Sequence, residues 1–218
     1  MNNKRLVTVL LVMVMCITVA GCGAAGSNSK ATYIANEEEI SVAVGQLGND
    51  LSGMSVSLDG TIYKLPMKMQ TLLDAGWTIP ADIIDRVDPF SALTETSGCI
   101  VTKTEGETEK KITNITLLNT AKEDKPVGDV PITTMSIDRY DNIKLILPKG
   151  IIWTSTIEDV KAAYGEPTKE TTTGTEDTFI NTLLMYEVAN GSVTIGFITE
   201  KGETKMSGVT FNYRAPSE

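Results

Sequence analysis

The chain has 218 residues, of which 41% are hydrophobic and 22% charged, and its net charge at pH 7 is −9. This length and composition are typical of a globular protein with one domain or two small ones. The acidic balance argues against nucleic acid and anionic lipid as direct partners. The chain contains no His, which excludes Ser-His-Asp triads, Cys-His dyads, His general bases and His-based zinc sites. We therefore expect a protein that is not an enzyme and that holds no cofactor or metal.

The first 22 residues have the layout of a secretory signal. Lys4 and Arg5 are followed by an apolar run over residues 6–19, and then by small residues up to Gly21. The run is too short to span a bilayer, which takes about 20 apolar residues. Cys22 directly after Gly21 resembles the lipobox of bacterial lipoproteins, in which a small residue precedes an invariant Cys. The resemblance implies cleavage between Gly21 and Cys22 and a diacylglyceryl group on the Cys22 thiol.

This reading divides the N-terminal part of the chain into a lipoprotein signal peptide, residues 1–21, and a flexible tether, residues 22–31. Loss of Lys4 and Arg5 takes the net charge from −9 to −11. The expected location is the extracytoplasmic face of the cell membrane. Cys99 is then left without a disulfide partner, and its expected role is that of a small buried apolar residue.

The rest of the chain reads as two tandem copies of one unit, residues 32–134 and 135–218. Met-Ser opens both copies, at Met54 and at Met135. In each copy an alternating strand, an Asp-Gly or Asp-Asn turn and a second strand predict a tight hairpin. The preceding residues 33–45 are compatible with a short edge strand or an irregular segment.

A helix follows the hairpin in each copy. The predicted helices run from Pro66 or Met67 to Gly76, and from Ser155 or Thr156 to Gly165. Glu158 or Asp159 completes a capping box in the second helix, and Pro167 prevents its continuation. Trp77 and Trp153 flank the helices; either is a core residue or an exposed binding anchor, and core packing is favoured.

Strand-like alternation fills the rest of each copy. Asn190-Gly191 predicts a tight hairpin, and residues 78–98 and 168–178 are expected to be exposed loops. The predicted strands are residues 99–103, 111–119, 132–139, 182–188, 192–199 and 205–213. The predicted fold class is therefore α+β, with two tandem repeats, each a helix packed on an antiparallel β-sheet.

Residues 150–167, which contain the capped helix and its Gly165-Glu-Pro167 ending, carry the strongest resemblance. They resemble the helix of small exported lipoproteins in the BamE-like and β-lactamase-inhibitor-protein-like (BLIP-like) group, and the tandem arrangement is similar to that of the inhibitor proteins. Lipoproteins of Gram-positive bacteria whose function has not been characterised also look like this. The first copy lacks the Pro after Gly76, and the shared positions are structural, so no functional residue transfers.

Three functions remain open. The favoured one is a lipid-anchored binding or scaffolding protein whose partner is a protein or a cell-wall polymer, with lipidation of Cys22 as the only assigned site. A cell-wall enzyme using carboxylates is the alternative, since glycosidases need two acids in a cleft; its available acids are Asp82, Asp85, Asp88, Glu176 and Asp177. A small-ligand receptor is the third, although such receptors usually need a deeper cleft than a chain of this length builds.

Overall fold

The computed structural model describes residues 33–175 and 177–214, so the predicted signal peptide, Cys22 and Glu176 lie outside the described residues. Strand residues (48%) outnumber helical residues (24%) by two to one. The helices are α1 (Glu37–Leu47), α2 (Met69–Asp74), α3 (Ala81–Val87) and α4 (Ile157–Tyr164). The strands are β1 (Ser55–Leu58), β2 (Thr61–Lys64), β3 (Met67–Lys68), β4 (Thr94–Glu105), β5 (Thr108–Asn119), β6 (Pro131–Asp138), β7 (Leu145–Ile146), β8 (Lys169–Thr175), β9 (Phe179–Val188), β10 (Gly191–Glu200) and β11 (Glu203–Tyr213).

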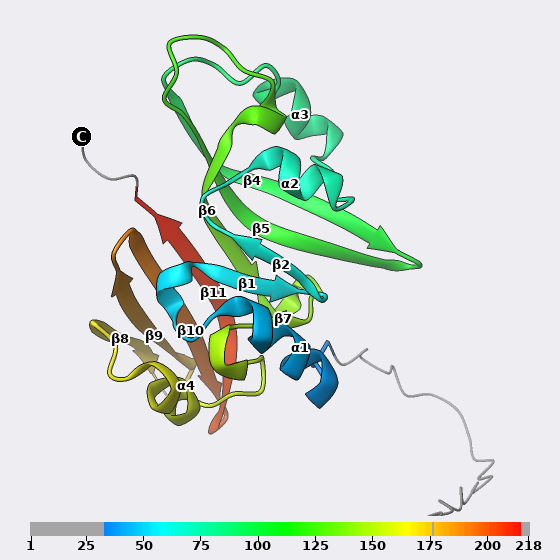
Figure 1. Cartoon of the computed structure of the whole chain (residues 1–218). Coiled ribbons are helices and arrows are strands. Elements are labelled where there is room, and N and C mark those ends of the chain that lie inside the picture. The colour runs from blue at the N-terminus through cyan, green and yellow to red at the C-terminus, as the bar shows by residue number, and fades with distance from the viewer. Residues whose placement is uncertain (1–32, 176, 215–218) are drawn as a thin grey trace, which may run out of the picture. The chain divides into compact units, whose positions relative to one another are not determined.

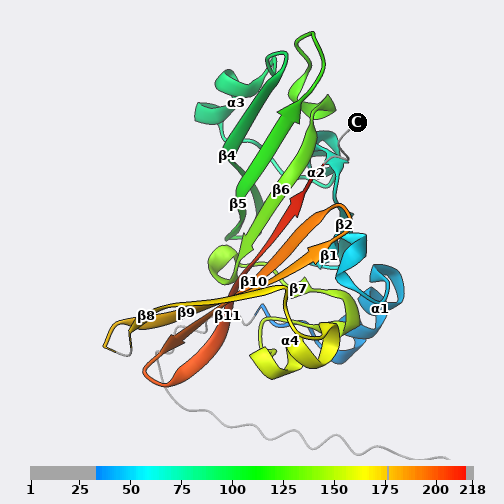
Figure 2. The ribbon, with the colours of Figure 1, turned by 90° about the vertical axis from the view of Figure 1, so that its left-hand side faces the viewer.

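One continuous antiparallel sheet dominates the described residues (Figures 1 and 2). Its strands follow the order β4-β5-β6-β11-β10-β9-β8, and β3 pairs with the start of β6. The predicted α+β fold of two tandem repeats, each a helix on its own sheet, is therefore wrong, and the described residues form a mostly β structure. β6 hydrogen-bonds to β5 along one edge and to β11 along the other, and the boundary drawn between residues 134 and 135 falls inside it. Alternation along a strand specifies its two faces but not its neighbours, so it did not reveal this pairing.

A second, three-stranded sheet has the order β2-β1-β7. Its β7 pairs with β1, not with β6, so the hairpin predicted after Met135 does not form. The chain turns instead through a 3₁₀ helix, η3 (Arg139–Asp141), in which Asp138 accepts from the amide of Tyr140 and Asp141 accepts from the amide of Asp138. The reciprocal cap explains why Asp141-Asn142 is not a hairpin turn.

The other predicted hairpins are confirmed. Leu58 pairs with Thr61 across Asp59 and Gly60, both of which have positive φ (50° and 82°), as a two-residue primed turn requires. β9 and β10 form the second hairpin, although Gly191 is already a strand residue there and pairs with Val188. All six predicted strands of the large sheet are present.

The observed helices agree in part with the predicted ones. α2 ends before Gly76, and α4 has the predicted capping box between Thr156 and Asp159. α1 replaces the edge strand or irregular segment; its Asn36–Glu39 capping box was visible in the sequence. The two expected loops were wrong in part, because residues 78–98 contain α3 and the start of β4, and residues 168–178 contain β8.

The core lies between the large sheet and the elements on one of its faces. α2, α3 and α4 contribute Leu72, Val87 and Val160 to the same buried cluster as the sheet residues. Trp77 and Trp153 belong to it as well, which confirms core packing for both. Their indole nitrogens donate to the Tyr63 hydroxyl (3.1 Å) and the Ile143 carbonyl (2.7 Å), and so satisfy the buried N–H groups.

α1 packs on the small sheet through a separate cluster. Ala43 and Leu47 are buried there against Ile146 of β7, with Ile62 and Ile152 at the margin. The helix therefore covers the small sheet.

β10 and β11 approach each other closely at Gly191. Its φ is 143°, and a Cβ placed there would lie 1.9 Å from the Asn212 carbonyl oxygen. We expect Gly191→Ala to lower the free energy of unfolding by about 2–3 kcal/mol, because the strands must separate. Gly202→Ala is the matched control: Gly202 has a φ of 79° with nothing within 4 Å, so only the backbone penalty of about 1 kcal/mol applies. Equal losses in urea unfolding would contradict the close approach.

Candidate binding surface

The two faces of the large sheet differ in chemistry. On β10, Val193, Ile195 and Phe197 point into the core and are buried. Of the alternate residues, which point to the opposite face, Thr194 and Ile198 are only partly buried. We call this opposite face the open face.

Strand register shows which side chains share the open face. Met185, Thr194, Thr210 and Ser136 lie in one row across β9, β10, β11 and β6. The hydroxyls of Ser136 and Thr210 are 3.0 Å apart and share a hydrogen bond. The middle of the open face is therefore a ladder of short hydroxyl side chains.

In the next row of the open face, an apolar side chain is followed by two glycines and then by Asp138. Leu183 is 37% exposed and pairs with Gly196, which in turn pairs with Gly208. A Cβ on Gly196 would lie 3.3 Å from Leu183, so the leucine side chain lies close over the glycine. Phe179 lies four residues before Leu183 on β9, on the same face, and is 49% exposed. Leu183 and Phe179 are thus exposed large apolar side chains on the open face.

Sequence reasoning missed this apolar edge, because the predicted strand began at residue 182. Phe179, Leu183 and Met185 are separated by even numbers of residues, so a strand extended back to residue 179 places them on one face. Thr-rich β8, expected as a loop, supplies the neighbouring strand that places Phe179 on a sheet.

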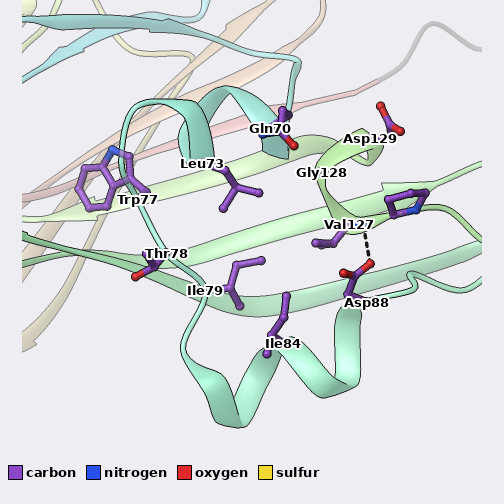
Figure 3. Close-up of a pocket in the computed structure, with 11 residues that line it drawn as sticks. Gln70, Leu73, Trp77, Thr78, Ile79, Ile84, Asp88, Val127, Gly128 and Asp129 are labelled. Atoms are coloured by element: carbon purple, nitrogen blue, oxygen red, sulfur yellow. Dashed lines mark hydrogen bonds between the residues drawn. The ribbon is translucent and has the colours of Figure 1, made fainter.

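A pocket of about 390 Å³ lies between α2, α3 and the Val127–Asp129 turn (Figure 3). Leu73, Ile79 and Ile84 form apolar walls, and Gln70 and Thr78 are among its polar residues. The side chains in Figure 3 converge on this space from both helices. The pocket is large enough for one apolar side chain or a small ligand.

The acids proposed for a carboxylate enzyme are not brought together as a facing pair at this pocket. Asp88 lines it, but its Oδ1 accepts a 3.1 Å hydrogen bond from the Val127 amide. Asp129, also in the lining, lies 2.9 Å from the Lys68 ammonium. Asp82 and Asp85 belong to α3, and Asp177 lies in the turn between β8 and β9. The two lining carboxylates thus already have hydrogen-bond partners.

A second pocket, of about 470 Å³, lies beside the end of α4. Two of its lining residues, Tyr164 and Tyr186, pack edge to face with ring centres 5.8 Å apart. Their hydroxyls donate to the carbonyls of Pro148 and Gly165, and burial raises the pKa of both. These phenols hold the helix end in place and stay protonated.

Two other reactive side chains have structural roles. Cys99 is buried as predicted, and burial raises the pKa of its thiol, which disfavours the thiolate needed for reaction. The Lys110 ammonium lies 3.0 Å from Asp59 and 2.6 Å from Glu105. Burial lowers the pKa of Lys110, but the bonds to Glu105 and Asp59 outweigh it and raise the pKa overall. A lysine that stays charged is a poor nucleophile.

Within residues 33–175 and 177–214, no group of three or more Cys, Asp or Glu side chains is arranged to hold a metal ion. No helix in that part of the chain has the length and apolarity needed to cross a membrane. Searches of protein-family models, curated proteins and solved structures returned no match to this chain. The resemblance to BLIP-like lipoproteins and the lipidation of Cys22 stay predictions.

Proposed function

We propose that this protein is a non-catalytic, extracytoplasmic lipoprotein, anchored in the cell membrane through Cys22, that binds a protein partner at the open face. The observation that carries the proposal is the exposure of Phe179 (49%) and Leu183 (37%) on strand β9. Both lie on a regular sheet, which presents them in a defined geometry. Exposed apolar residues on a sheet face favour a protein partner over a small solute.

Charge indicates the kind of partner. The processed chain would carry a net charge of −11 after loss of Lys4 and Arg5 from the −9 of the full sequence. Such a surface accelerates encounter with basic proteins and slows encounter with acidic ones. We therefore infer a partner that packs apolar side chains against Phe179 and Leu183 and carries basic residues around them.

A pair of matched variants tests this surface. A photo-crosslinking residue at position 183 of the full chain, in its native cells, should capture one defined protein that position 93 does not capture. With that protein purified, Leu183→Asp should weaken binding at least about ten-fold, since central apolar contacts dominate interfaces. Leu93→Asp is the control, because Leu93 is 68% exposed and lies outside the open face.

Thermal unfolding of both variants separates lost binding from lost folding. Unchanged affinity of a folded Leu183→Asp protein would overturn the open face as the binding surface. A partner captured equally at both positions would do the same.

A further inference from the structure

The described chain begins at Tyr33, and its position shows which end of the domain an anchor would hold. Tyr33 lines an open hollow with Tyr140, Asn142, Lys111 and Glu109. The side-chain amide of Asn142 donates a hydrogen bond to the Glu109 backbone carbonyl (3.0 Å). This bond links the residue after η3 to the start of β5. We call these five residues the tyrosine surface.

Chain length limits how far this surface can lie from the anchor. Eleven residue steps separate Cys22 from Tyr33, and a chain advances at most about 3.6 Å per residue, so the span is at most about 40 Å. The ten steps along β5 from Glu109 to Asn119 place the far end of that strand roughly 34 Å away. The backbone amide of Leu93 donates a hydrogen bond to the carbonyl of Ala121, two residues beyond the end of β5. Bringing Leu93 to the bilayer would stretch the connecting residues almost fully, at a large cost in chain entropy.

The chemistry of the tyrosine surface suits a bilayer interface. Tyr140 is 78% exposed, although both ends of its turn are held by the Asp138–Asp141 capping box. An aromatic ring with a polar tip is favoured at the level of lipid headgroups. Lys111 lies 3.2 Å from Glu109, and Glu107 lines the same hollow. Zwitterionic headgroups carry no net charge and therefore do not repel this end.

We propose that the tyrosine surface lies against the headgroup region of the bilayer, with Tyr140 in contact with the lipid interface. The proposal rests on the lipid anchor at Cys22 proposed above. It places the open end of the β4–β5 hairpin, where β4 begins after Leu93 and β5 ends at Asn119, away from the membrane.

Two labelled variants of the lipidated full chain test the orientation. Tyr140→Cys and Leu93→Cys are each labelled with a polarity-sensitive fluorophore and bound to phosphatidylcholine vesicles. Cys99 does not compete for the label, because it is 2% exposed and burial raises its pKa. We expect a several-fold rise in emission on vesicle binding for the label at 140, little change at 93, and little effect of salt.

Co-sedimentation with the vesicles separates the two proposals. If the chain sediments and the label at 93 responds as strongly as that at 140, or neither responds, the orientation is overturned while the anchor stands. If the chain does not sediment at all, the anchor and the orientation fail together.

Discussion

A Cys22→Ser chain is expected to be lost entirely from the membrane fraction and recovered as a protein without lipid. The reason is that the thiol is the proposed attachment point of the acyl chains. Each buried CH₂ contributes about 0.8 kcal/mol, so two acyl chains hold a protein firmly, and this contribution is lost without the thiol. Fractionation of the cells and mass spectrometry of the native N-terminus measure the effect.

Cys16→Ser is the matched control. Cys16 lies in the apolar run of the predicted signal and would be removed with it. This variant should keep the mass and the membrane location of the original chain. An intact Met1 in the native product, or an unmodified sulfur on Cys22, would contradict lipidation and with it the proposed location.

Replacement of Asp141 should give the largest pH-dependent change in stability. Asp141 is buried, and burial raises its pKa from about 3.8 to about 7. The amide of Asp138 and the charge of Lys111 act in the opposite direction, whereas the Asp138 carboxylate adds to the rise. The folded state therefore keeps a proton that the unfolded state loses as the pH rises through 4. Stability falls between pH 4 and pH 7 by roughly 4 kcal/mol from this group, at about 1.4 kcal/mol for each pH unit.

Asp141→Asn removes this dependence, because an amide does not ionise and still offers an oxygen to the Asp138 amide. Its extra buried N–H groups cost about 1–3 kcal/mol at every pH. The free energy of unfolding of the variant minus that of the original chain should therefore rise from pH 4 to pH 7 and then level off. Urea unfolding at several pH values measures the difference.

Asp129→Asn provides the control of opposite sign. The hydrogen bond from Lys68 lowers the pKa of the exposed Asp129, so this variant can only lose a small stabilisation above acidic pH. Its difference curve should fall slightly or stay flat. A flat curve for Asp141→Asn as well would show that the Asp141 carboxyl is not desolvated in the folded protein.

Local features were predicted well where the residues themselves impose the geometry. Asp59-Gly60 tolerates positive φ and formed its hairpin, and Thr156 with Asp159 capped α4. Core packing was favoured for Trp77 and Trp153 because Trp is usually buried, and both are buried. The capping box of α1 at Asn36 is also visible in the sequence, but that segment was not predicted as a helix. The predicted strand at residues 182–188 began three residues too late to include Phe179.

The candidate site was less accessible to sequence reasoning. A binding or scaffolding role was expected, but no residue of a binding surface was named. Phe179 and Leu183 are prominent only because β8 and β10 flank β9 and hold them on one surface. In a linear sequence they are indistinguishable from core residues such as Leu184.

What the sequence determined by itself is short-range: the type and approximate ends of most strands, the caps of α4 and the burial of the two tryptophans. These depend on backbone preferences and on side chains a few residues apart. Strand partnership was decided only by the tertiary structure. β6 pairs with β11, and β7 pairs with β1. Long-range pairing depends on which strand edges are free in the collapsed chain, and alternation along a strand does not specify this.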